Sequence, residues 1–301
     1  MATTPTAVQA PAEPRRSIAE ALRADRRWAM WASYFFLVLF IIFFLFPPYY
    51  MLITSFKTNA EISSLAGNPW LIQGGVTLDH YRNLLANTSF LVFFKNTVIV
   101  TVCVVTITMV VSILAAYSLS RLRFWGSAVL ATGVFLTYLV PETLLFIPLF
   151  KMVGGLGLLN SYWSLVLVYP TISIPFCTWI MIGYFSSIPR ELDEAALIDG
   201  CNHFQMLTKI FIPVALPGII AATIFAFTVS WAQFIYPLAF LYSEDQLVLT
   251  VGTVTTLIRG DVYHWGSLMA GALLAAAPPV ILYAFLMDYY IAGLTSGATK
   301  S

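Results

Sequence analysis

Long apolar runs alternate with short polar segments along this chain of 301 residues. Each run is long enough to cross the hydrocarbon of a bilayer as a helix, which takes about 20 residues. Glu142 is the one charged residue within them. The runs are Trp28–Phe56, Asn96–Ser120, Phe124–Phe150, Trp163–Phe185, Val214–Tyr242 and Gly266–Met287. The pattern predicts an all-α polytopic membrane protein with six transmembrane helices.

Composition agrees with a membrane protein and excludes several other classes. Hydrophobic residues make up 59% of the chain and charged residues 10%, whereas soluble domains carry roughly 25% charged residues. A net charge of +1 indicates no nucleic-acid partner. The three cysteines and three histidines are scattered, so we expect neither a disulfide framework nor a metal site.

One polar stretch, Pro189 to Pro213, separates the fourth and fifth runs. It holds six formal charges within twenty residues, namely Arg190, Glu191, Asp193, Glu194, Asp199 and Lys209. Each would cost several kcal/mol in hydrocarbon, so the stretch must lie outside the bilayer. Gly200 favours the left-handed conformation that ends a helix, and Asn202 suits a helix cap. The stretch therefore predicts two short helices with a turn at Gly200.

The spacing of this stretch resembles the EAA loop of ABC importer permeases, EAA-x3-G-x9-I-x-L-P. One position departs from the pattern, because Ile212 stands where Leu is usual. In that family the loop is the coupling helix, which docks in a groove of the ATP-hydrolysing subunit. The resemblance implies that the residues coupling this chain to an ATPase are Glu194, Ala195, Ala196, Gly200, Ile210 and Pro213.

Other segments are similar to the carbohydrate-importer class of these permeases. Ala116 to Arg121 resembles a turn after the second span, and Ile147 to Phe150 resembles part of the third. Trp231 begins a segment similar to W-N-E-F-x-x-P-L, although Ala232 and Gln233 depart from Asn and Glu. The resemblance implies a maltose-permease-like subunit that moves a sugar or sugar-like solute. Its implied partners are a homologous second permease, two ATP-binding subunits that hold ATP and Mg, and an external solute-binding protein.

The distribution of basic residues predicts the orientation. Six spans place both termini and the polar stretch on one side, and that side carries ten of the fifteen Lys and Arg residues. The positive-inside rule makes it the cytoplasmic side of a bacterial plasma (inner) membrane. We predict a cytoplasmic segment over 1–27, a transmembrane domain over 28–293 with its coupling loop at 189–213, and a cytoplasmic tail over 294–301.

Several polar and aromatic residues within the runs are candidates for the substrate path. Glu142 could accept sugar hydroxyls, or it could be bonded within the fold or lie at the interface. An aromatic face beside an amide suits a sugar, and Trp231, Gln233 and Tyr236 offer one. Helix packing is the alternative for these aromatic residues. Asn96 is a candidate ligand or, alternatively, a helix cap.

The loop from Ser243 to Trp265 falls on the external side of this topology. The resemblance implies that such a loop contacts the binding protein, and the glycines would allow a compact protrusion. The contact candidates are Gly252, Arg259, Gly260 and Asp261.

The chain has no G-x-x-x-x-G-K-[ST] sequence, so ATP hydrolysis is expected from a separate subunit and the chain itself is not expected to be an enzyme. The alternative is an ion-coupled secondary transporter of small solutes, which usually shows paired intramembrane charges and repeated broken helices. A membrane-embedded enzyme would need clustered His, Asp or Glu, and the sequence shows no such cluster.

Overall fold

The computed structural model describes residues 18–64, 66–122, 124–259 and 262–298, with side chains over 28–64, 66–122, 124–258 and 263–287. In chain order the helices are α1 (Ile18–Phe56), α2 (Asn59–Ser63), α3 (Asp79–Asn87), α4 (Phe90–Arg121), α5 (Ser127–Tyr138), α6 (Glu142–Gly155), α7 (Trp163–Ser187), α8 (Glu191–Ile198), α9 (His203–Met206), the π-helix η1 (Leu207–Phe211), α10 (Ile212–Val214), α11 (Leu216–Ala232), α12 (Ile235–Phe240), α13 (Leu249–Leu257) and α14 (Trp265–Ala298). Two short strands, β1 (Ile258–Arg259) and β2 (Val262–Tyr263), pair antiparallel.

The all-α membrane fold is confirmed. Four helices are each long and apolar enough to cross a bilayer, and two bent helix pairs bring the number to as many as six over the described residues. The four are Trp28–Phe56, Phe90–Arg121, Trp163–Ser187 and Trp265–Met287. Because α1 begins at Ile18 and α14 continues to Ala298, the expected boundaries near 27 and 293 fall inside helices.

The chain divides into two compact units, Met1–Tyr50 and Met51–Ser301. Within the described residues, the first unit is the part of α1 from Ile18 to Tyr50. Its side chains from Trp28 to Tyr50 are all exposed and overwhelmingly apolar, as suits a helix that faces lipid or another apolar surface.

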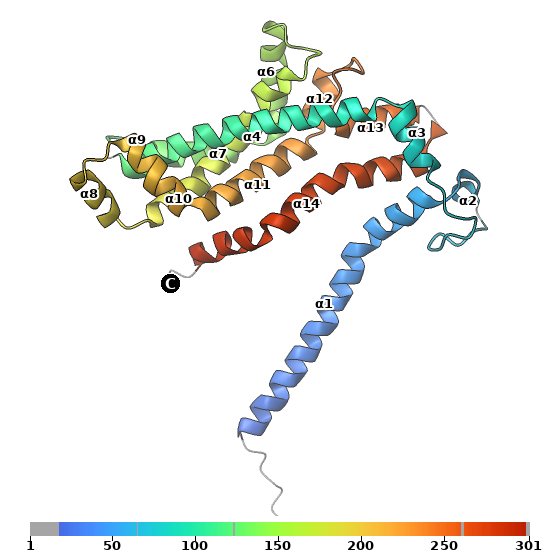
Figure 1. Ribbon diagram of the computed structural model, residues 1–301, viewed down its shortest axis with the longest axis horizontal. Coiled ribbons are helices and arrows are strands. Elements are labelled where there is room, and N and C mark those ends of the chain that lie inside the picture. The colour runs from blue at the N-terminus through green and yellow to red at the C-terminus, as the bar shows by residue number, and fades with distance from the viewer. Residues whose placement is uncertain (1–17, 65, 123, 260–261, 299–301) are drawn as a thin grey trace, which may run out of the picture. The chain divides into compact units, whose positions relative to one another are not determined.

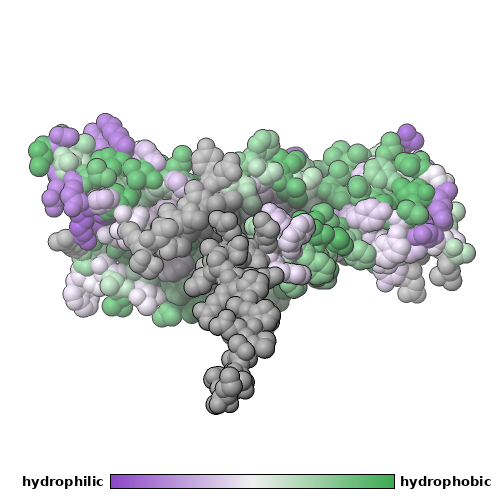
Figure 2. Space-filling view, turned by 90° about the horizontal axis from the view of Figure 1, so that it is seen from below, coloured by the Kyte–Doolittle hydropathy of each residue, from purple (hydrophilic) through white to green (hydrophobic). Residues whose placement is uncertain are grey.

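In the second unit α4, α7, α11 and α14 run side by side (Figure 1). Small and hydroxyl side chains let these helices approach closely. Between α4 and α7, the hydroxyl groups of Thr108 and Ser173 lie 2.7 Å apart and both residues are buried. In Figure 2 the most hydrophilic side chains lie toward the two ends of the view, among hydrophobic ones. One end carries α8 and α9, and the other carries α3 and α13 (Figure 1).

The third apolar run is not one straight span. It forms α5 and α6, which meet at an angle of 93° around the segment 139–141. Pro141 precedes α6, and a residue before proline is disfavoured in the helical region, so Val140 is a natural place for the helix to stop. Within the expected span from Phe124 to Phe150, the structure therefore places α5 followed by a sharply turned α6.

The fifth run is also shorter than expected. Its main helix α11 ends at Ala232, and a break at Gln233 and Phe234 leads into α12. At its start, α11 is bent by 81° from the segment His203–Val214. Within the expected span from Val214 to Tyr242, the structure thus places α11, a break at Gln233 and Phe234, and the short α12.

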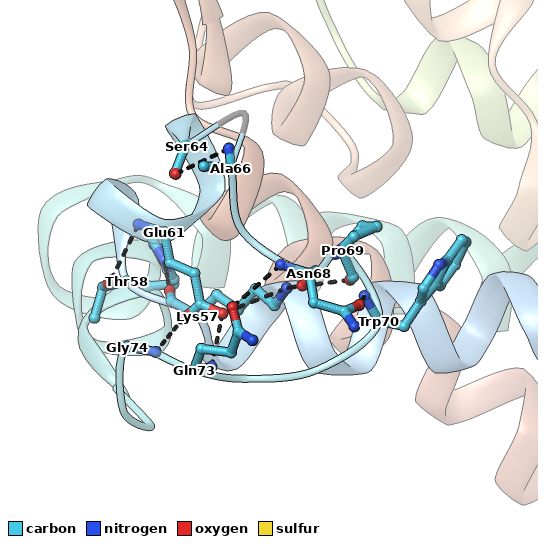
Figure 3. A network of polar contacts seen from close by, with 11 residues as sticks. Lys57, Thr58, Glu61, Ser64, Ala66, Asn68, Pro69, Trp70, Gln73 and Gly74 are labelled. Carbon is cyan, nitrogen blue, oxygen red and sulfur yellow. Dashed lines mark hydrogen bonds and ion pairs between the residues drawn. The ribbon is translucent and has the colours of Figure 1, made fainter.

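A polar network holds the loop between α1 and α3 (Figure 3). The ammonium group of Lys57 lies 3.5 Å from the Glu61 carboxylate and donates to the backbone carbonyl of Asn68 across 2.9 Å. The carboxylate also accepts the backbone N–H groups of Gln73 and Gly74 at 2.8 Å each. Lys57 is buried, and the Glu61 carboxylate balances its charge within the loop, as a buried ammonium group requires.

Candidate functional site

The polar stretch Pro189–Pro213, hereafter the insert, folds as two helical segments. The first is α8, and Gly200 then adopts φ of +77°, the left-handed conformation expected of it. The side-chain oxygen of Asn202 accepts the backbone N–H of Gln205 and so caps α9. The side-chain oxygen of Gln205 accepts the backbone N–H of Asn202, which completes a capping box. The expected helix–turn–helix is confirmed, and its second half continues through η1 and α10.

The outer surface of the insert carries part of the expected coupling set. Glu194 and Ala195 are exposed, whereas Ala196 is buried at 4% exposure. The surface also exposes apolar side chains at Leu197, Ile198 and Phe204, the last two at 86% and 71%. Large apolar side chains in contact with water favour a partner surface. Gly200 and Pro213 are exposed and Ile210 is half-buried.

The inner surface of the insert is anchored by Arg121, which the sequence placed only in the turn after the second span. Arg121, the last residue of α4, places its guanidinium 3.1 Å from the carboxylate of Asp193 in α8. It also donates to the carbonyls of Phe185 and Ile188 at the end of α7. Its guanidinium carbon lies 4.7 Å from the ring centroid of Phe211, a cation–π contact.

An aromatic cluster surrounds this anchor. Tyr117, one turn before Arg121, packs edge-to-face on Phe185 and Phe211, with ring centroids 6.5 Å and 5.3 Å away. Its hydroxyl is hydrogen bonded to Nδ1 of His203 across 3.0 Å. The insert is therefore packed against α4 and α7 through both of its helical segments.

Three of the candidate path residues come together where the two broken spans meet. The side-chain amide of Gln233 donates to the Glu142 carboxylate across 3.2 Å, and the Tyr236 hydroxyl donates to the Glu142 carbonyl across 3.2 Å. Glu142 begins α6, where the helix dipole favours a carboxylate. Of the alternatives for Glu142, the structure thus shows the one in which its carboxylate is bonded within the fold.

Trp231 has a packing role in this structure. Its indole nitrogen donates to the carbonyl of Ala275 in α14 across 3.0 Å. Pro279 lies four residues beyond Ala275 and has no N–H to donate, so that carbonyl lacks its intrahelical partner. The Trp231 ring stacks on Phe227 at 5.3 Å and meets Phe94 edge-on at 5.8 Å. The structure therefore shows Trp231 in helix packing, and a role of Trp231 as a solute ligand stays a prediction.

Asn96 is neither an open ligand nor a helix cap. Its side-chain amide donates to the carbonyls of Asp245 and Leu247 across 2.8 Å and 2.9 Å, and the residue is buried. Both protons of the amide are therefore used within the fold. This bonding ties α4 to the segment that precedes α13.

The expectation that Gly252 belongs to a protruding loop is wrong. This glycine is buried in α13, and a Cβ added to it would lie 2.5 Å from the Phe93 ring. The close approach of α13 to α4 requires a residue without a side chain here. Arg259 ends β1, but its side chain, Gly260 and Asp261 lie outside the described residues.

A small cavity lies beside Gln233. Hydroxyl groups dominate its polar lining, which includes Thr97, Thr101, Tyr169, Ser230 and Thr250. Its volume of about 10 Å³ is on the scale of one water molecule and far below that of a sugar. Across the described residues, no group of three or more His, Cys, Asp or Glu side chains could hold a metal ion.

Known protein families and proteins share sequence with this chain. Residues 108–296 match the family described as binding-protein-dependent transport system inner membrane component. The inner membrane ABC transporter permease protein YcjP of Escherichia coli is 35% identical over 88% of this chain and 94% of its own length. The trehalose/maltose transport system permease protein MalG of Thermococcus litoralis is 33% identical over 87% and 94%.

A solved structure shares the fold. It is a bacterial ABC transporter involved in the import of the acidic polysaccharide alginate, and the matching chain is 23% identical with a TM-score of 0.77. The match covers 93% of this chain and 100% of that chain.

Proposed function

The chain belongs to the binding-protein-dependent transport system inner membrane components, and from that premise we propose that it is a permease subunit of a bacterial ATP-driven importer for a sugar or sugar-like solute. The observation that carries the coupling part of the proposal is the insert. It presents Glu194, Ala195 and an apolar surface outward, while Arg121 anchors it from within.

The sugar class rests on the relatives. MalG of Thermococcus litoralis is named for trehalose and maltose transport, and it aligns over nearly its whole length. A solute of this kind is rimmed by hydroxyl groups, which suit amide and carboxylate partners. We propose Glu142, Gln233 and Tyr236 as the polar contacts of the path once the contact between the two broken spans opens. Trp231 and Asn96 are left out, because each donates to backbone carbonyls outside this group of three residues.

The proposed assembly contains a second, homologous permease and two ATP-binding subunits, which bind ATP and Mg and carry out hydrolysis. Docking uses the outer surface of the insert, where Glu194 meets a basic group of the ATPase and Ala195 allows close approach. Among the other members of the expected coupling set, Gly200, Ile210 and Pro213 shape this surface, whereas Ala196 packs inward. An external solute-binding protein delivers the solute, with the segment Arg259–Asp261 as a proposed contact.

In the proposed orientation the termini and the insert face the cytoplasm. Single cysteines can test this in a background without Cys103, Cys177 and Cys201. A cysteine at the exposed Lys209 should resist an impermeant thiol reagent in intact cells, whereas one at the exposed Val76 should react. Labelling at Lys209 from outside would contradict both the orientation and the proposed docking to a cytoplasmic ATPase.

Uptake by reconstituted vesicles tests the function. The permease pair, the ATPase subunits and the binding protein should together accumulate solute only when ATP is enclosed with the ATPase. The alternative is an ion-coupled transporter, which would move solute down a proton or sodium gradient without ATP. Uptake that persists without ATP and stops when ionophores collapse the gradient would establish that alternative.

A further inference from the structure

Arg121 joins three elements through one side chain. Its partners are the end of α7, through the Phe185 and Ile188 carbonyls, Asp193 of α8, and the ring of Phe211 in η1. The bonds to Ile188 and Asp193 measure 2.6 Å and 3.1 Å. A planar guanidinium offers five donors in a fixed fork, so it can hold these partners at set angles in a way that an ammonium group cannot.

The charges at this junction match the helix ends that they face. Carbonyls at the C-terminus of α7 carry partial negative charge and meet the guanidinium, while Asp193 lies in the first turn of α8, where a carboxylate is favoured. The side chains of Arg121 and Asp193 are only 5% and 19% exposed. Removing either charge would leave the other buried without its partner, which is strongly unfavourable.

The helix that carries Arg121 is suited to act as a stiff link. Over the described part of the chain, four helices can each cross a bilayer alone, namely α1, α4, α7 and α14, and of these only α4 lacks an internal proline. Its sequence also contains no glycine. Sharp kinks in helices occur chiefly at such residues, so α4 is the least bendable of the four. Its 32 residues extend about 48 Å at 1.5 Å per residue.

The far end of α4 is bonded to the segment beside the path. Asn96 holds the carbonyls of Asp245 and Leu247, and the Thr97 hydroxyl accepts the Leu249 N–H across 2.8 Å. The next residue, Thr250, donates to the Gln233 carbonyl across 2.7 Å. Figure 1 shows the insert and α13 at opposite ends of α4. Both ends of this stiff helix are therefore fastened by polar contacts.

We propose that Arg121 is a positioning residue that fixes the insert to α4, and that α4 transmits displacement of the insert to the segment Asp245–Thr250 beside Gln233. This inference rests on the proposed docking of an ATPase to the insert. It adds to that docking a specific route of transmission. The route runs from the docking surface through the buried Arg121–Asp193 ion pair and α4 to the contact between the broken spans.

The test compares two Arg–Asp pairs of the chain in reconstituted complexes. Asp193→Asn removes the charge from the buried pair with little change of shape, and Arg121→Gln removes it from the other side. Asp79→Asn is the matched control, because Asp79 pairs with Arg82 at 3.6 Å but is 78% exposed. We expect the ratio of receptor-stimulated to basal ATP hydrolysis to fall about tenfold in Asp193→Asn and Arg121→Gln, and to stay unchanged in the control. If Arg121→Gln does not accumulate in the membrane, Asp193→Asn decides.

A second readout separates transmission from loss of local structure. Hydrogen–deuterium exchange of residues 245–257 should change on addition of a non-hydrolysable ATP analogue in the wild-type complex. The same segment should not respond in Asp193→Asn, although the ATPase still copurifies. Wild-type stimulation and a wild-type exchange response in Asp193→Asn would overturn the inference. A wild-type complex that binds no ATPase would instead overturn the proposed function.

Discussion

The side-chain amide of Gln233 donates a hydrogen bond to the carboxylate of Glu142 across 3.2 Å, joining two residues 91 positions apart. Glu142 begins α6 just after the bend from α5, and Gln233 directly follows α11 at its break from α12. The contact therefore joins the two broken spans at the start of α6 and at the end of α11. In the proposed function, opening a path between them requires this bond to separate or to exchange for bonds to solute.

The first prediction concerns this bond. Glu142→Ala would leave the Gln233 amide without its acceptor, so we expect the free energy of unfolding to fall by about 1–2 kcal/mol. Thermal unfolding of the purified subunit measures this change. In the double variant Glu142→Ala with Gln233→Ala, the loss should be smaller than the sum of the single losses. Strict additivity would show that the two side chains do not interact.

The second prediction concerns Trp231. Trp231→Phe keeps an aromatic ring but removes the donor to the Ala275 carbonyl, which Pro279 leaves without an intrahelical bond. We expect a loss of about 1–3 kcal/mol in stability, with the same KM for uptake. A tenfold rise in KM at unchanged stability would restore Trp231 to the solute path and contradict the packing role.

Local chemistry explains why the insert could be predicted from the sequence. Its charges exclude it from hydrocarbon, the turn at Gly200 needs a positive φ, and Asn202 caps the helix that follows it. Each of these features depends on a few neighbouring residues. The six apolar runs were also visible, because hydropathy reports burial in lipid whatever the neighbours are.

Long-range contacts explain what could not be predicted. Arg121 meets Phe185, Ile188 and Asp193 across 64, 67 and 72 positions, and no local pattern reveals such partners. The 93° bend between α5 and α6 occurs inside an almost uniformly apolar run. Hydropathy has the same value for a straight and a bent span, so it predicts the extent of the run but not its bend. Pro141 was the one local sign of the break.

The third prediction tests the packing of α13. A methyl group at Gly252 would lie 2.5 Å from the Phe93 ring, so Gly252→Ala should destabilise the subunit by about 1–3 kcal/mol through overpacking. Phe93→Leu should recover part of that loss in the double variant. Thr255→Ala, at an exposed position of the same helix, is the control and should be close to wild type. Equal stability of Gly252→Ala and the control would support a protruding loop instead.

The fourth prediction concerns the pH dependence of the loop in Figure 3. The backbone N–H of Gln73, followed by that of Gly74 and by the charge of Lys57, lowers the pKa of Glu61 below its ordinary value of 4.5. A lowered pKa in the folded state means that the contribution of Glu61 is present above its unfolded pKa and is lost as the pH falls through the folded one. The loop should therefore loosen only below about pH 4.5.

A nitroxide label at the exposed Val76 can follow this transition by its mobility. The label should gain mobility below about pH 4.5 in the wild type. In Glu61→Gln it should be mobile at every pH, whereas Asp79→Asn, which alters an exposed carboxylate, should follow the wild-type curve. A wild-type curve for Glu61→Gln would show that the carboxylate does not hold the loop.

The central claim is that the insert couples this chain to a separate ATPase, and receptor-stimulated ATP hydrolysis in proteoliposomes tests it most directly. Glu194→Lys reverses an exposed charge at the proposed contact. In Gly200→Val the added Cβ has no neighbour within 4 Å, but the residue must keep φ near +77°. That conformation strains a residue with a side chain by about 1–2 kcal/mol. Gly200→Asn is the matched control, because Asn tolerates that conformation. We predict that stimulation is lost in Glu194→Lys and Gly200→Val and is retained in Gly200→Asn. Wild-type stimulation in both Glu194→Lys and Gly200→Val would contradict the claim.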